Sequence, residues 1–215
     1  MATRKLNPEP NQGRKSAYVA RNRVALIKAA QRVLAEHGAE ASIEVFAQEA
    51  EISVSTIYKH FPNKEALIVE AFASAFHQWE ADSDAVLQQI SDPIEELVAP
   101  MRLFVRLKHT HPLFAAMVAR NISELPRAFG RTEEGLVLHI EELRKKKLLN
   151  FDNPEIRIRL ISACLASTMA ELIVNPAATE RGADTAIEVI LGLLEIPEDI
   201  ARQVATKPLP PLSTT

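Results

Sequence analysis

The stretch of sequence that decides the fold is residues 53–67, which read SVSTIYKHFPNKEAL. Its apolar side chains recur with the i, i+3, i+4, i+7 spacing of one helix face, at Val54, Ile57, Tyr58 and Phe61. This spacing predicts a short helix over 54–60 that turns this face inward and its small polar and basic side chains outward. Pro62 breaks the chain, and Asn63 can cap a further helix that begins at residue 64.

Two more helices are expected before this stretch. Apolar residues predict a helix from about Tyr18 to His37, with one stripe formed by Val24, Ile27, Ala30, Val33 and Leu34. Gly38 ends this helix, because glycine tolerates the left-handed conformation just past a helix end. Ser42 is a good N-cap for a second helix that runs to about Ala50. Three short helices with a tight turn between the last two form a helix-turn-helix arrangement.

The rest of the chain shows longer helical patterns, most of which begin near a proline. We expect helices near 64–81, 93–109, 112–121, 126–148, 154–174 and 183–195, followed by a short one over 197–204. No segment shows sustained period-two alternation, so no strand is expected. The fold class is all-α, with an N-terminal three-helix helix-turn-helix domain joined to a larger helical domain. The expected boundaries are a flexible basic arm over 1–16, the helix-turn-helix over 17–64, the larger domain over 65–206 and a flexible proline-rich tail over 207–215.

Charge is divided unevenly along the 215 residues of the chain. Residues 1–64 contain 10 Lys and Arg against 6 Asp and Glu, whereas residues 65–215 contain 15 against 22. The excess is +4 in the first part and −7 in the second, which together give the net charge of −3. A basic unit joined to an acidic one suggests that only the first meets a polyanion.

The composition excludes several other classes of protein. Apolar residues make up 47% and charged residues 25%, as in ordinary globular chains. The longest stretch without a charged side chain, 160–170, has 11 residues, fewer than the roughly 20 of a membrane helix. The N-terminus lacks the apolar segment of a secretory signal, and Cys164 alone cannot form a disulfide framework. We therefore expect a cytoplasmic protein with no membrane partner.

No sequence motif points to catalysis. The dinucleotide pattern GxGxxG, the nucleophile elbow GxSxG and the metalloprotease pattern HExxH are absent. Gly130 and Gly135 have the spacing of a phosphate loop, but leucine and valine follow where lysine and a hydroxyl residue are needed. His109 and His111 lack further metal ligands at helical spacing. We therefore expect a protein that is not an enzyme and uses no cofactor and no metal.

The span from Arg21 to Leu67 resembles the DNA-binding domain of the tetracycline-repressor (TetR) family of bacterial transcription regulators. The likeness is most specific over residues 53–67, where the family commonly shows small polar residues, an aliphatic residue before Tyr, then Phe, a turn, Lys, Glu and Leu. Supporting segments are the end of the first helix, residues 29–38, and residues 46–50 of the second. The rest of the chain agrees with the family only in length and helical character.

Two residues depart from the family pattern. Glu51 stands where a glycine usually separates the second and third helices, and Val45 stands where a charged or polar residue is usual. A glutamate held at a positive φ costs about 1 kcal/mol relative to glycine. These departures concern the geometry of the turn and not the presumed contacts to DNA.

The resemblance implies contacts to a double-stranded DNA operator, and the chemistry of the residues agrees. Short hydroxyl side chains at the start of the third helix allow close approach to base edges. Tyr58 is expected to pack its ring inward and direct its hydroxyl to a phosphate, while Lys64 adds a charge at a helix N-terminus. The DNA-contacting residues that we expect are Arg21, Ser42, Ser53, Ser55, Thr56, Tyr58, Lys59, His60 and Lys64. Each also has an ordinary alternative role as a cap, a core residue or a solvated surface group.

For the larger domain, the resemblance implies binding of a small-molecule effector and homodimerisation. The pocket residues that we expect are Phe76, Met101, Phe104, His109, Met117 and Glu171, although an ordinary core or surface position is the simpler interpretation of each. The helices near 154–174 and 183–195 are expected to pair with their copies in a two-fold interface. Their apolar residues are Ile158, Ile161, Leu165, Leu172, Ile187, Ile190, Leu191 and Leu194. On this basis Ile190→Glu combined with Leu194→Glu is expected to give monomers or misfolded protein.

The resulting hypothesis is a ligand-responsive transcriptional repressor that leaves its operator when a small molecule binds. A TetR-like DNA-binding organiser or regulator without an effector is the main alternative, and a solid larger domain would favour it. A small helical enzyme is a third possible class, but the sequence contains no set of residues in a catalytic pattern.

Overall fold

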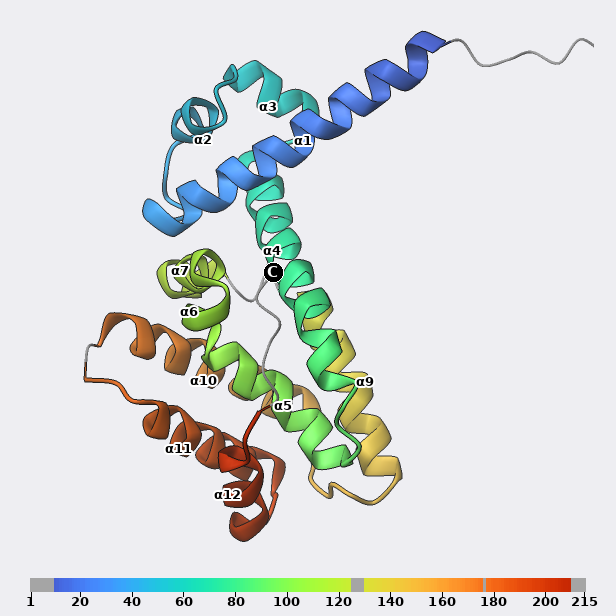
Figure 1. Cartoon of the computed structure of the whole chain (residues 1–215), viewed down its shortest axis with the longest axis vertical. Helices are drawn as coiled ribbons and strands as arrows, with labels where there is room; N and C mark the ends of the chain where they lie inside the picture. Colours follow the sequence, from blue (N-terminus) through green and yellow to red (C-terminus); the bar gives the residue numbers. More distant parts are fainter. Residues whose placement is uncertain (1–9, 125–129, 176, 210–215) are drawn as a thin grey trace, which may run out of the picture.

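The computed structural model describes residues 10–124, 130–175 and 177–209 of the chain (Figure 1). Every regular element in these residues is a helix, which confirms the all-α fold class. Three N-terminal helices form a head at one end of the molecule, the helices after residue 92 form a body, and one long helix runs from the head into the body (Figure 1).

The head consists of α1 (Pro10–Glu36), α2 (Ile43–Glu49) and α3 (Val54–His60). The bounds of α2 and α3 agree with the sequence pattern, because each helix begins directly after a serine with extended backbone. The three helices share one apolar cluster with the connecting helix and with part of the body, and its largest fully buried members are Leu26, Leu34, Phe46, Ile57, Leu67, Phe72, Leu107, Met117 and Met169. We call this set of residues the head cluster.

α1 is longer than the sequence pattern predicts. It begins at Pro10, so residues 10–16 are helical where the pattern favours a flexible arm, while residues 1–9 lie outside the described part. Proline suits the first turn of a helix, and the single Gly13 costs only about 1 kcal/mol inside one. Val24 is 54% exposed, so it does not belong to the buried stripe as expected.

The connecting helix is α4 (Lys64–Leu87), which continues past the expected end near residue 81. The body consists of α5 (Pro93–Val105), α6 (Leu107–Thr110), α7 (Pro112–Arg120), η1 (Ile122–Glu124), α9 (Gly130–Lys145), α10 (Pro154–Val174), α11 (Glu180–Leu191), η2 (Gly192–Leu194) and α12 (Glu198–Thr206). The expected start of α9 at residue 126 lies among residues 125–129, outside the described part.

Several helix ends in the body differ from the expectation: α9 ends at Lys145 rather than residue 148, α11 ends at Leu191 rather than residue 195, and α12 ends at Thr206 rather than residue 204. The helix expected over 93–109 is interrupted at Arg106, where the backbone forms a 3₁₀-type hydrogen bond to Leu103. The last long helix starts at Glu180 rather than residue 183, because the side chain of Thr179 caps it. A 3₁₀-type turn and a threonine cap therefore shift these two ends by a few residues.

The body has its own apolar cluster, contributed by α5, α9, α10, α11 and α12. Phe104 packs against both this cluster and the head cluster, so the two cores are continuous. The start of the tail, expected to be flexible, is attached, because Lys207 forms an ion pair with Glu95 and Leu209 packs against the head cluster. Residues 210–215 lie outside the described part.

Candidate nucleic-acid interface

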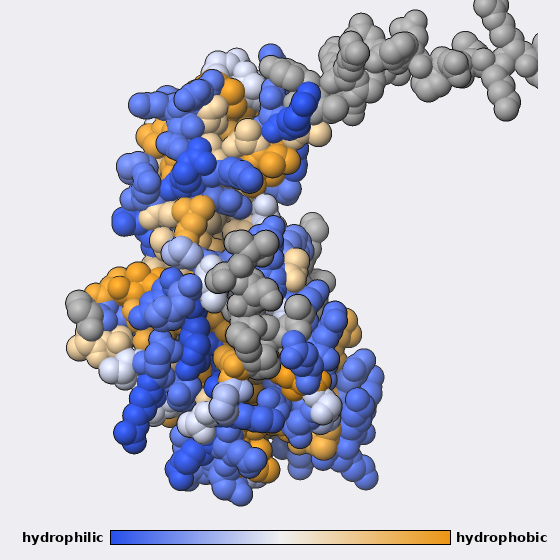
Figure 2. All heavy atoms as spheres, in the orientation of Figure 1, coloured by the Kyte–Doolittle hydropathy of each residue, from blue (hydrophilic) through white to orange (hydrophobic). Residues whose placement is uncertain are grey.

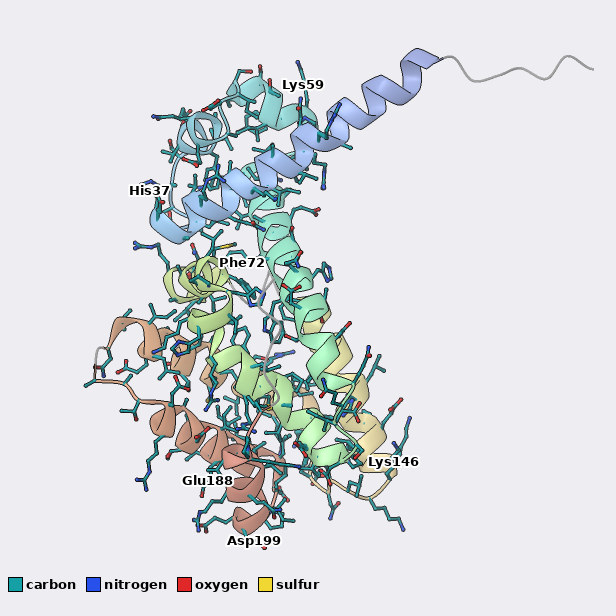
Figure 3. The ribbon with its side chains drawn as sticks, viewed as in Figure 1. His37, Lys59, Phe72, Lys146, Glu188 and Asp199 are labelled. Atoms are coloured by element: carbon teal, nitrogen blue, oxygen red, sulfur yellow. The ribbon has the colours of Figure 1, made fainter. Side chains whose placement is uncertain are left out.

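α3 is anchored from inside and capped at its start. Ile57 is completely buried and Phe61, directly after the helix, is 4% exposed, so the inner face is held against the head cluster. The hydroxyl of Ser53 accepts the N–H of Thr56 at 3.3 Å, which satisfies one of the free donors at the helix start. Lys59 lies on the outer side of the head (Figure 3). The outer face of α3 is thus held in a fixed orientation toward solvent.

Three hydroxyl groups meet at the N-terminal end of α3. The Oγ of Ser53 lies 2.9 Å from the Oγ of Ser55 and 2.9 Å from the Oγ1 of Thr56. A hydroxyl group can donate or accept a hydrogen bond by rotation, so such groups suit both donor and acceptor base edges. Since Ser53 serves as the helix cap, Ser55 and Thr56 are the hydroxyl residues left to face a ligand.

The aromatic and basic residues of α3 lie at the surface. Tyr58 is 49% exposed, so its ring is only partly packed inward, because Ile57 and Phe61 already fill the contact with the head cluster. Within the described residues, the side chains of Tyr58, Lys59 and His60 form no ion pair or hydrogen bond. A phenol hydroxyl and an ammonium without protein partners suit phosphate oxygens.

Lys64 is bound within the head, which its position in the sequence does not indicate. Its Nζ donates to the carbonyl of Ala39 at 2.9 Å and to that of Ala41 at 3.1 Å. Both carbonyls belong to the loop between α1 and α2, so the ammonium ties the start of α4 to this loop. An ammonium has three donors, which leaves one for a phosphate.

Ser42 and Glu44 form a pair at the start of α2. Ser42 makes no side-chain cap bond; its hydroxyl and the backbone N–H of Glu44 hydrogen-bond the Glu44 carboxylate and lower its pKa below the ordinary value. The carboxylate is fully exposed and ionised at neutral pH. A negative charge therefore lies beside a residue expected to contact a phosphate.

The two arginines near the middle of α1 differ in their surroundings. The Nη1 of Arg23 lies 2.9 Å from a carboxylate oxygen of Glu70, and its guanidinium carbon lies 4.9 Å from the centre of the Phe61 ring. Arg21 is exposed and forms no ion pair with the described residues. Arg23 thus ties α1 to α4, and Arg21 is the arginine available to a partner.

The turn between α2 and α3 has a left-handed residue. Glu51 has φ 53°, a conformation that glycine adopts without the steric cost of a Cβ atom. The departure from the family pattern therefore carries strain, yet α3 begins where the sequence predicts. Val45, the other departure, is half-buried against the head cluster.

Residues 26–71 match the family described as bacterial regulatory proteins, tetR family. The matched segment runs from the middle of α1 through α2 and α3 into α4, which is the part that carries the capped and anchored helix. The N-terminal domain belongs to the TetR family. This match confirms the resemblance expected over residues 21–67. No curated protein matches the chain.

Solved structures share the fold of nearly the whole chain. RolR in complex with resorcinol has a TM-score of 0.67 and 20% identity, over 92% of this chain and 100% of that one. A tetR family transcription regulator from Shewanella sp. has a TM-score of 0.65 and 14% identity, over 80% and 96%. FadR from Bacillus subtilis in complex with stearoyl-CoA has a TM-score of 0.60 and 17% identity, over 80% and 97%. At these identities the likeness shows the fold of a TetR-family transcriptional regulator.

The body is attached to the TetR-family head by hydrogen bonds from the end of α7. Asn121, directly after α7, is 3% exposed; its Oδ1 accepts the N–H of Ala39 at 2.6 Å and its Nδ2 donates to the carbonyl of Leu34 at 3.0 Å. The Nε of Arg120 donates to the carbonyl of Ala35 at 3.0 Å. Two of the last carbonyls of α1, which lack partners within that helix, are thus satisfied by the body.

The loop after α1 is consequently held from two sides. Asn121 holds it from α7, and Lys64 holds it from α4. The sequence gives no sign of the contact at Asn121, because an asparagine after a helix is an ordinary end signal. Through this loop, the position of α2 depends on both helices.

The structure does not bring the six expected effector-pocket residues together. Phe76 and Met117 are buried in the head cluster and Met101 in the body cluster, with Phe104 between them. The other two lie at the surface, where His109 pairs with Glu180 and Glu171 accepts a hydrogen bond from Asn175. Four of the expected residues therefore belong to the packed core and two to the surface.

The apolar residues expected to form the dimer interface are core residues. All eight, from Ile158 to Leu194, are at most 8% exposed within a single chain. The exposed apolar side chains of α10 and α11 are different ones, namely Ile156, Leu160, Ile173, Val174 and Val189, of which Val189 is 71% exposed. Figure 2 shows a hydrophobic area beside the turn that joins α10 to α11.

Two kinds of structure do not occur in the described part of the chain. None of its helices is both long and apolar enough to cross a bilayer. No group of three or more His, Cys, Asp and Glu side chains among the described residues is arranged to hold a metal ion.

Proposed function

We propose that the protein is a cytoplasmic, homodimeric transcriptional repressor that binds a specific DNA operator and leaves it when a small-molecule effector binds. The observation that carries the proposal is the outer face of α3, which is rigidly anchored by Ile57 and presents unpartnered Tyr58 and Lys59 to solvent. Its position after α2 within a TetR-family domain supports the role of a recognition helix in the major groove.

In this proposal, some residues of the head contact base edges and others contact phosphates. Ser55 and Thr56 lie at the start of α3, where short side chains can reach base edges and so select sequence. The residues assigned to phosphates are Arg21, Ser42, Tyr58, Lys59, His60 and the remaining donor of Lys64, and they set register and affinity. Ser53 acts mainly by capping α3.

Dimerisation is proposed through the outer faces of α10 and α11. Ile156, Leu160 and Val189 are exposed apolar side chains that a second copy would cover by an isologous contact. Two heads in such a dimer engage half-sites spaced by about 10 bp, or a multiple of it, on a palindrome-like operator.

The effector step is supported by the fold and by the ligands named for proteins that share it. RolR was solved with resorcinol and FadR with stearoyl-CoA. In this chain α4 starts at the DNA end of the head and continues into the body, so a ligand that tilts α4 would change the spacing of the heads. Regulation of this kind needs a coupling of roughly 1–3 kcal/mol.

A regulator without an effector is the second candidate. It is favoured by the burial of Phe76 and Met101 in the two apolar clusters, where each side chain is at most 8% exposed. The two candidates share the head and differ only in the body.

Selection of bound fragments from genomic DNA, with the full chain and with added small molecules, tests the proposal. We expect a palindrome-like motif, and Thr56→Ala is expected to relax base preference within it. Lys59→Ala is expected to weaken binding to all DNA sequences. It should also reduce the slope of log affinity against log salt concentration by about one unit. Equal, salt-insensitive binding of all fragments would contradict a sequence-specific regulator, and a motif insensitive to every added molecule would favour the effector-free alternative.

A further inference from the structure

A groove of about 300 Å³ lies between α1, α4 and α7, where the head meets the body. Its buried lining is apolar and includes Ile27, Phe114 and Met117. Two further apolar side chains of the lining are open to solvent, Val24 at 54% and Leu113 at 42%. A groove of this volume lies at the lower end of the range for small-molecule sites, which run from about 300 to 1,000 Å³.

The polar groups around the groove are not equally available. The Nε2 of Gln31 donates to the carbonyl of Ala71 at 3.1 Å, and His111 pairs with Asp82 at 3.0 Å. The side chains of Lys28 and Ser74, in contrast, form no ion pair or hydrogen bond within the described part of the chain.

The groove carries a positive charge, and no acidic side chain belongs to its lining. The residues that line it include no Asp or Glu, and the carboxylate of Asp82 just outside them is occupied by its bonds to His111 and Gln78. The ammonium of Lys28 is therefore an unpaired positive charge next to exposed apolar side chains. An unpaired ammonium forms strong, charge-assisted hydrogen bonds to carboxylate oxygens.

We propose that this groove binds a small organic anion, an aromatic or branched aliphatic carboxylate. Its apolar part would cover Val24 and Leu113 and rest on Phe114, while its carboxylate would accept hydrogen bonds from Lys28 and Ser74. A cation of the same shape is repelled by Lys28, and a neutral molecule loses the charge-assisted bond. This site lies at the junction of the head and the body, and of the six residues expected to form the effector pocket only Met117 lines it.

The proposal does not depend on operator binding. A ligand in the groove touches α1 of the head together with α4 and α7, so it stabilises the folded arrangement of these three helices by mass action. Stabilisation and affinity are measurable on the free protein, whatever DNA sequence it recognises.

Calorimetric titration of the full chain with 2-naphthoate and with the uncharged 2-naphthamide tests the proposal. We expect 2-naphthoate to bind about tenfold more tightly than the amide, the factor of one charge-assisted hydrogen bond at a partly exposed site. Lys28→Gln is expected to lower the affinity for 2-naphthoate to that of the amide. The affinity for the amide itself should not change. Ser74→Phe, which fills the groove from an exposed position, is expected to abolish binding of both.

Lys146→Gln is the matched control, because Lys146 is an exposed lysine at the far end of the body (Figure 3). It is expected to bind both compounds as the unmodified chain does. In protein labelled at the methionine methyl groups, 2-naphthoate should shift the resonance of Met117, which lines the groove. Unchanged 2-naphthoate affinity in Lys28→Gln and Ser74→Phe, or no binding at millimolar concentration, would overturn the proposal.

Discussion

Replacing Asn121 with alanine is expected to loosen the head from the body. The side chain makes three hydrogen bonds, to the N–H of Ala39 at 2.6 Å and to the carbonyls of Leu34 and Met117 at 3.0 and 2.6 Å. A buried hydrogen bond contributes about 1 kcal/mol net, and a buried donor left without a partner costs about 1–3 kcal/mol. Because Asn121 is 3% exposed, water cannot replace it fully, and we expect a loss of about 2–4 kcal/mol in the free energy of unfolding.

Urea denaturation at a fixed protein concentration measures this loss. The matched control is Asn175→Ala, since the Oδ1 of Asn175 also accepts a backbone N–H and its Nδ2 also donates a hydrogen bond, in this case to the Glu171 carboxylate at the surface. The control should lose less than about 1 kcal/mol. Hydrogen exchange gives a second readout, because amides of residues 37–41 should lose protection in Asn121→Ala and keep it in the control. Equal losses in the two variants would refute the role assigned to Asn121.

Asn121→Asp extends the same test to pH. An aspartate keeps the acceptor for Ala39 but places a carboxylate against the carbonyls of Leu34 and Met117. The folded protein then favours the neutral form of this side chain, so the pKa of the introduced aspartate rises above its unfolded value of about 4. The stability of this variant relative to Asn121→Ala should therefore be greatest below pH 4 and fall as pH rises through the folded pKa. A pH-independent difference between the two variants would contradict this reasoning.

Three further predictions concern the turn, the interface and the dimer. Glu51→Gly should raise the free energy of unfolding by about 1 kcal/mol, because it removes the Cβ from a residue at φ 53°, whereas the control Glu51→Ala should not; denaturant titration compares them. Glu44→Gln should raise operator affinity about two- to threefold at low salt and less at high salt, as fluorescence anisotropy can measure, and a salt-independent gain would contradict charge repulsion. Val189→Glu should give folded monomers in sedimentation, since this side chain is 71% exposed, whereas Ile190→Glu, at 3% exposure, should unfold the chain; a folded Val189→Glu dimer would place the interface elsewhere.

The parts of the protein that follow from the sequence are those with local causes. α3 has its expected bounds because a serine cap, an apolar spacing and a proline act within ten or so neighbouring positions. The same local logic applies to α7 and α10, each of which starts at a proline. The left-handed turn at Glu51 could also be anticipated, since the family pattern calls for glycine there.

Contacts between residues far apart in the chain were decided by the tertiary structure alone. Nothing near Lys64 indicates that its ammonium binds two carbonyls of the α1–α2 loop, and nothing near Asn121 indicates that it completes the end of α1. The same holds for the apolar residues of α10 and α11, because spacing identifies an apolar helix but not how many of its sides the chain itself covers. Helices, caps and turns depend on neighbours in sequence, whereas burial and long-range hydrogen bonds depend on which surfaces the folded chain brings together.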